Sequence, residues 1–135
     1  MEPMTLTWAE LDALAFGEAL VADTSRLSNR VRGEGVRLAA LLARVRPSVE
    51  ATHVMVHDDG EYRACLTLAE AQAAAVLAHR EAGAPLAEGS GGPVRLLLPT
   101  SDNACLSVKR VSRVEILTRA EPDTVPRPTT PLRPR

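Results

Sequence analysis

The spacing of apolar residues predicts two amphipathic helices in the first third of the chain. The first opens with the capping box Thr7–Glu10, in which the threonine hydroxyl and the glutamate side chain satisfy free backbone amides. The second covers residues 36–45, where leucine and valine recur at helical spacing. The glycine-rich residues 33–35 break the chain before this helix, and Pro47 ends it.

A third helix is expected after residue 66. It begins with a second capping box, Thr67–Glu70, and continues through an alanine-rich sequence to about residue 79 or 81. Gly83 is the expected C-terminal cap of this helix. In that position His79 would lie on the polar, solvated side of the helix.

Shorter apolar runs predict strands. Residues 52–57 alternate, with Val54 and Val56 on one face. Asp58-Asp59-Gly60 is a strong hairpin signal, and residues 61–66 form the expected returning strand. Further strands are expected at residues 18–23, 94–98 and 106–117. Helices and strands together predict an α+β domain.

Length and composition indicate one folded domain. The chain has 135 residues, enough for a single core, and the expected domain covers residues 1–119. Residues 120–135 are rich in proline, threonine and arginine, which predicts a disordered tail. A net charge of −1, with one tryptophan, one tyrosine and one phenylalanine, gives no sign of a nucleic-acid partner.

The sequence also bears on membranes and cell compartment. No apolar run reaches the roughly 18 residues of a membrane span, so no membrane span is expected. The first residues have neither a basic segment nor a long apolar segment of the secretory type. This favours the cytoplasm, or the periplasm for a chain whose leader has been removed.

Cysteine and histidine positions argue against a metal site. Cys65 and Cys105 are too few for a disulfide framework and lack metal-type spacing, so both are interpreted as small buried apolar residues. His53 and His57 stand four apart on a predicted strand, which separates them by about 13 Å, too far to share one ion. Nucleophile elbows, phosphate loops and dinucleotide fingerprints are absent from the sequence.

The most informative stretch is Gly91-Gly92-Pro93-Val94-Arg95, before three leucines of an apolar run. Glycine lets the backbone turn tightly or approach a ligand, and proline fixes the direction that follows. A guanidinium inside an apolar run needs an acceptor. Two interpretations of Arg95 stay open: an internal salt bridge, and a contact with a bound carboxylate or phosphate. Lys109 stands out as the only lysine among the basic residues.

Several segments, in order, resemble the oxidoreductase molybdopterin-binding domain family, which has the fold of sulfite oxidase. The resemblance covers about residues 27–117 and implies a mixed-sheet α+β fold. Residues 35–42 are similar to the family's Gly-Val-x-Leu-x-x-Leu-Leu helix entry. The other matching segments are Asp59-Gly60-Glu61-Tyr62, Leu66-Thr67-Leu68-Ala69-Glu70-Ala71, Val76-Leu77-Ala78, Gly83-Ala84-Pro85-Leu86, Gly91-Gly92-Pro93-Val94-Arg95-Leu96 and Val108-Lys109-Arg110-Val111.

The resemblance implies a pterin-binding site. It places Arg95 and Lys109 in the pocket, where a planar guanidinium and an ammonium suit phosphate or pterin oxygen. The family often has histidine where Ser90 stands, and Asn29 resembles the asparagine of its metal loop. The implied cofactor-binding residues are Asn29, Ser90, Gly91, Gly92, Arg95, Ser107, Val108 and Lys109.

One departure from the family changes the expected function. The family's enzymes hold molybdenum through a cysteine thiolate in the loop before the helix entry, and residues 23–32 contain no cysteine. We therefore expect little bound molybdenum, no catalytic residue and no metal ligand. The first hypothesis is a sensor or carrier that binds a pterin or molybdopterin, with a regulatory or redox protein as partner. The alternatives are a molybdopterin-dependent oxidoreductase or subunit with a degenerate metal site, and a structural module without a ligand.

Overall fold

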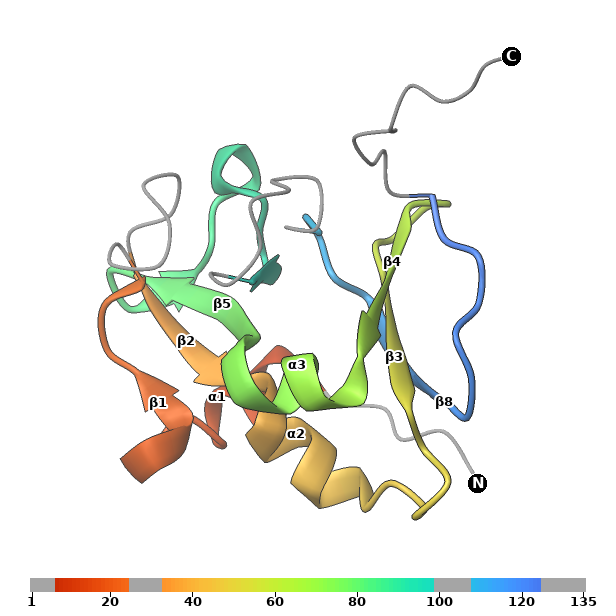
Figure 1. Cartoon of the computed structure of the whole chain (residues 1–135). Helices are drawn as coiled ribbons and strands as arrows, with labels where there is room; N and C mark the ends of the chain where they lie inside the picture. Colours follow the sequence, from red (N-terminus) through yellow and green to blue (C-terminus); the bar gives the residue numbers. More distant parts are fainter. Residues whose placement is uncertain (1–6, 25–32, 99–107, 125–135) are drawn as a thin grey trace.

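The structure is a computed structural model that describes residues 7–24, 33–98 and 108–124 (Figure 1). Its helices are α1 (Trp8–Asp12), α2 (Leu38–Val45) and α3 (Leu68–Ala74), with the 3-10 turns η1 (Gly17–Ala19) and η3 (Glu88–Ser90). Its strands are β1 (Leu20–Val21), β2 (Glu34–Arg37), β3 (His53–His57), β4 (Arg63–Thr67), β5 (Val76–Glu81), β6 (Ala84–Pro85), β7 (Arg95–Leu97) and β8 (Arg113–Leu117). The predicted α+β class is confirmed.

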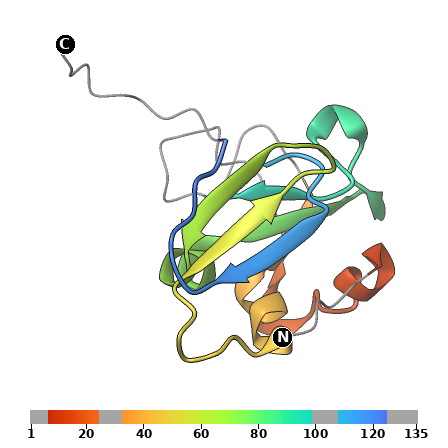
Figure 2. The ribbon, with the colours of Figure 1, turned by 90° about the vertical axis from the view of Figure 1, so that its right-hand side faces the viewer.

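The described strands form two sheets. One has five strands in the order β1-β2-β5-β6, with β7 also paired to β5, and the other has the order β4-β3-β8. Figure 2 views the second sheet from its outer side. All pairings among the described residues are antiparallel, so the mixed sheet expected from the resemblance is not what these strands form.

Both predicted helix starts with a threonine cap are confirmed. At α1, the Thr7 side chain accepts from the Glu10 amide, and the Glu10 side chain accepts from the Thr7 amide. At α3, the Thr67 side chain accepts from the Glu70 amide. The predicted break at 33–35 is wrong in part, because residues 34–37 form β2 between β1 and β5. Pairing on both sides extends the chain there, so α2 begins at Leu38 rather than at residue 36.

The long third helix is the largest error of the sequence prediction. Helix α3 ends at Ala74, because Ala75 is extended and Val76–Glu81 forms β5. This strand pairs with β2, β6 and β7, so tertiary pairing overrides the helical preference of an alanine-rich sequence. Gly83 is therefore not a helix cap. It has φ +81° in the tight turn between β5 and β6.

A shared core joins the two sheets and the helices. Val54 and Val56 of β3 point into this core, as predicted, and Val36, Leu77 and Leu96 enter it from the five-stranded sheet. A second, smaller cluster consists of Ala78, Leu86 and Leu97. Since Leu96 and Leu97 are neighbours on β7, the two clusters lie on opposite faces of that strand.

The end of the described chain lies beside β4. The Arg63 amide donates to the Thr124 hydroxyl at 2.8 Å, and the Cys65 amide donates to Asp123 Oδ2 at 2.6 Å. Figure 2 shows this segment running along β4 after β8. Residues 122–124 of the expected tail thus contact the domain, where they cover a strand edge. Residues 125–135 lie outside the described residues.

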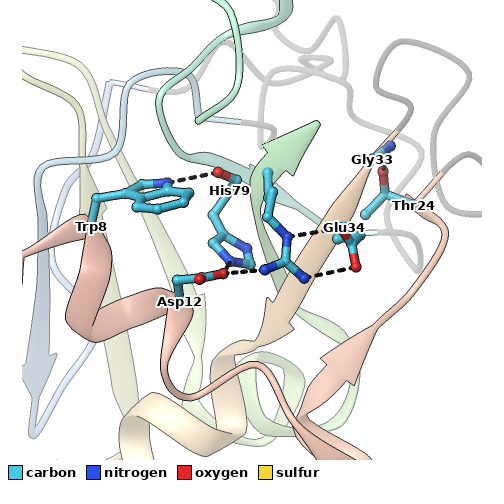
Figure 3. Close-up of polar contacts among 7 residues, drawn as sticks. Trp8, Asp12, Thr24, Gly33, Glu34 and His79 are labelled. Atoms are coloured by element: carbon cyan, nitrogen blue, oxygen red, sulfur yellow. Dashed lines mark hydrogen bonds and ion pairs between the residues drawn. The ribbon is translucent and has the colours of Figure 1, made fainter. Parts of the chain in front are cut away.

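His79 is part of a polar network that attaches α1 to the five-stranded sheet (Figure 3). The prediction of a solvated histidine is wrong, since His79 lies on β5 and is 0% exposed. Its Nε2 contacts Asp12 Oδ1 at 2.7 Å, and the Trp8 indole nitrogen donates to its carbonyl oxygen at 2.7 Å. Arg80 joins Asp12 to Glu34 through contacts of 2.8 Å.

The Asp12 carboxylate should contribute measurably to stability. Since an ionised carboxylate only accepts, His79 Nε2 donates to it, and Asp12→Ala leaves a buried donor without its acceptor. We expect the free energy of unfolding to fall by about 1–3 kcal/mol, measured by urea unfolding with the emission of Trp8, the only tryptophan. The exposed Glu50→Ala is the matched control. Equal stability of the two variants would contradict this role.

Glu34 should make stability depend on pH. Hydrogen bonding from Arg80 is the main cause that holds the pKa of Glu34 below its ordinary value. A carboxylate whose pKa is lowered in the folded state stabilises the protein at pH values above its ordinary pKa. This contribution is lost as the pH falls through the lowered pKa. We expect the free energy of unfolding of the native chain to exceed that of Glu34→Gln by less than about 1 kcal/mol at neutral pH. This difference should fade below about pH 4. A difference that is constant from neutral pH to pH 3 would refute this explanation.

Candidate functional site

The glycine pair forms a tight turn against Leu86. Gly91 ends the turn η3 with φ +90°, in the left-handed region that favours glycine. A Cβ atom on Gly92 would lie 1.9 Å from the carbonyl oxygen of Leu86, so only glycine fits. The amides of Gly91 and Gly92 donate to the carbonyl oxygens of Glu88 and Ala87 at 2.9 and 3.0 Å. Glycine therefore contributes space at this site rather than amide donors for a ligand.

Arg95 lies beneath this turn. It pairs with Ala78 of β5 on the strand face opposite to Leu96, the face of the smaller apolar cluster. The side chain is buried, with the residue 4% exposed, and Nη1 donates to the carbonyl oxygen of Ser90 at 3.2 Å. The arginine thus braces the glycine loop from below through a main-chain oxygen.

The segment with Lys109 runs beside the same loop. Leu96 donates to the Val108 carbonyl at 2.8 Å, and Arg110 donates to the Gly91 carbonyl at 2.9 Å. The expected strand at 106–117 is shorter, because Arg110 has φ +48° and β8 begins only at Arg113. Val108 is 0% exposed in the core, whereas its neighbour Lys109 is exposed. Because Val108 is fixed by burial in the core, the backbone of its neighbour Lys109 is fixed as well.

Arg95 and Lys109 converge on Gly91. A Cβ atom on Gly91 would lie 2.8 Å from Arg95 Cδ and 3.1 Å from Lys109 Cγ. Two cationic side chains thus lie next to a position in the turn that has no side chain. The Lys109 ammonium makes no ion pair with any residue that the structure describes.

Six of the eight predicted site residues are brought together by these contacts. They are Ser90, Gly91, Gly92, Arg95, Val108 and Lys109. The other two, Asn29 and Ser107, lie outside the described residues.

Sequence reasoning missed one contact at the site. Asp59 was interpreted only as a hairpin residue, yet Arg110 Nε donates to Asp59 Oδ1 at 3.1 Å. This hydrogen bond is the main cause that raises the pKa of Arg110. No spacing rule points to the contact, because the two residues are 51 positions apart.

A thiolate for molybdenum is not supplied by the described part of this site. Cys65 alternates on β4 with the core residues Ala64 and Leu66. It therefore faces the outer side of the three-stranded sheet and is partly exposed. The expectation of a buried core cysteine is therefore wrong for Cys65, and Cys105 lies outside the described residues. Within 7–24, 33–98 and 108–124, no three His, Cys, Asp or Glu side chains form a metal-type cluster.

The fold and these contacts define a small α+β domain with a glycine turn flanked by two cations. The chain belongs to the oxidoreductase molybdopterin-binding domain family, whose family model matches residues 21–125. This confirms the resemblance found in the sequence, and the match includes the segment that lies along β4. No curated protein matches the chain. None of the described helices has the length and apolarity of a membrane span.

The glycine turn can be tested without any ligand. Gly92→Ala forces a methyl group against the Leu86 backbone, so we expect a loss of about 1–3 kcal/mol, the usual range for overpacking. Gly89→Ala in the same turn is the matched control, because a Cβ atom there meets nothing within 4 Å. Urea unfolding of both variants measures the difference. A Gly92→Ala variant as stable as Gly89→Ala would show that the turn is not held against Leu86.

Proposed function

We propose that the protein binds a pterin, or molybdopterin, at the turn formed by Ser90, Gly91 and Gly92, and that Lys109 holds its anionic group. Membership of a molybdopterin-binding family supports the ligand class. The convergence of Arg95 and Lys109 on Gly91 is the single observation that carries the proposal, because it places two cations around a position without a side chain.

The two cations have different roles in this proposal. Arg95 is buried and donates to the Ser90 carbonyl, so its first role is to hold the loop in shape. Lys109 is exposed, and an ammonium offers three donors and a full charge to a phosphate or carboxylate. Lys109 is therefore the principal ligand contact, and Arg95 adds positive charge from below.

The role is that of a non-catalytic sensor or carrier. A molybdenum centre of the family's type needs a soft thiolate ligand, and residues 23–32 offer serine, asparagine and arginine instead. The organic part of the cofactor requires only oxygen- and nitrogen-binding groups, which Lys109 and Arg95 provide. A sensor or carrier passes on its loaded state, so a regulatory or redox protein is the expected partner.

Lys109→Ala should separate ligand binding from folding. Hydrogen bonds to charged groups contribute about 1.5–3 kcal/mol, so the affinity for pterin-6-carboxylate should fall at least about tenfold. Uncharged pterin should lose much less, because it lacks the anionic group, and Lys109→Arg should keep most of the affinity. Titrations followed by the fluorescence of the pterin measure both ligands. Melting temperature should change little, since the lysine is exposed.

Two results would replace this proposal. If neither pterin binds the native chain, and Lys109→Ala and Arg95→Ala only lower its melting temperature, the protein is a structural module. If protein from a host that makes molybdopterin carries near-stoichiometric molybdenum, the oxidoreductase alternative takes precedence. The proposal expects bound pterin with far less than one molybdenum per chain.

A further inference from the structure

The two aspartates of the β3–β4 hairpin make different contacts. Asp58 fixes the turn itself, since its Oδ1 accepts from the amides of Gly60 and Tyr62 at 2.7 and 3.1 Å. Asp59 is left out of these contacts and instead accepts from Arg110 Nε at 3.1 Å. The hairpin belongs to the three-stranded sheet, whereas Arg110 is hydrogen-bonded to the glycine loop above β7.

Arg110 stands in an unusual backbone conformation. Its φ of +48° lies in the left-handed region, which a residue with a side chain adopts only where its surroundings hold it. Its own amide is bound to the Gly91 carbonyl at 2.9 Å, and Val111 is bound to the Val94 carbonyl at 2.8 Å. The guanidinium contact with Asp59 is the side-chain part of this restraint.

Lys109 is next to this restrained residue. Because Cγ of Lys109 lies 3.1 Å from the Cβ position of Gly91, a small rotation of the backbone at Arg110 would move the lysine stem off the turn. The Asp59–Arg110 pair is 58% and 42% exposed, so it contributes little to overall stability. Its effect is on the position of the segment rather than on the stability of the domain.

We propose that Asp59 and Arg110 are positioning residues that hold Lys109 against Gly91 and so determine the affinity of the site for an anionic pterin. This inference rests on the proposed function for the identity of the ligand, but the placement of Lys109 does not depend on any ligand. Neither residue is proposed to contact the pterin.

Electrostatics and positioning predict opposite signs for one substitution. Asp59→Asn removes a negative charge near a cationic site, and charge alone would then strengthen the binding of an anion. Loss of the restraint on Lys109 would weaken binding instead. Glu61→Gln is the matched control, because Glu61 is an exposed residue of the same hairpin and the substitution removes the same charge.

The first experiment measures pterin-6-carboxylate affinity in these variants. We expect Asp59→Asn to bind about threefold to tenfold more weakly than the native chain, and Arg110→Gln to do the same. Glu61→Gln should bind equally or slightly more tightly, and Asp59→Glu should recover part of the affinity. Asp59→Asn binding as tightly as Glu61→Gln would overturn the inference.

The second experiment needs no ligand. Reductive 13C-methylation labels only the amino terminus and Lys109, because the chain has one lysine, and Lys109→Arg assigns the signal. We expect Asp59→Asn to move the Lys109 methyl signal towards that of a free lysine, with Glu61→Gln leaving it in place. An unchanged signal in Asp59→Asn would refute the positioning role even if the native chain binds pterin. A shifted signal in a chain that binds no pterin would support the positioning role and reject the ligand.

Discussion

The close approach of the Gly91–Gly92 turn to its surroundings is the constraint on which the site depends. Gly92 lies against the Leu86 backbone, and Leu86 is fixed in turn by packing with Ala78 and Leu97. A buried guanidinium needs acceptors, and the turn supplies the Ser90 carbonyl as one acceptor for Arg95. Without two glycines the loop would lift from β7, and the arginine would lose both its cover and this partner.

The site is a product of packing between the two sheets. Val108 is buried in the core that both sheets share, and the residues after it are bound to the glycine loop on one side and to the β3–β4 hairpin on the other. Because Lys109 stands between the buried Val108 and the restrained Arg110, its backbone position has little freedom. Directly after Ala78, the partner of Arg95 on β5, His79 and Arg80 bind Asp12 and attach the first helix to the same sheet. The central strand thus connects the N-terminal helix with the site.

Local chemistry made part of this structure predictable. The capping threonines, the Asp58-Asp59-Gly60 hairpin and the alternation of Val54 and Val56 each depend on neighbours within a few residues, and each is confirmed. The alanine-rich helix was extended too far because the pairing that makes Val76–Glu81 a strand comes from β2, β6 and β7, distant in sequence. Burial of His79 and the Asp59–Arg110 contact were missed for the same reason. The cluster of six site residues was predicted from family resemblance, since no periodicity brings Lys109 to Gly91.

A crystal structure of the protein isolated from a host that makes molybdopterin would test the proposed pterin site most directly, with anomalous diffraction recorded at the molybdenum edge. We expect pterin density beside Gly91, with its anionic group at the Lys109 ammonium and Arg95 still under the turn. We expect no molybdenum peak of full occupancy. Density for the pterin at another place on the molecule, or a fully occupied molybdenum site, would contradict the proposal.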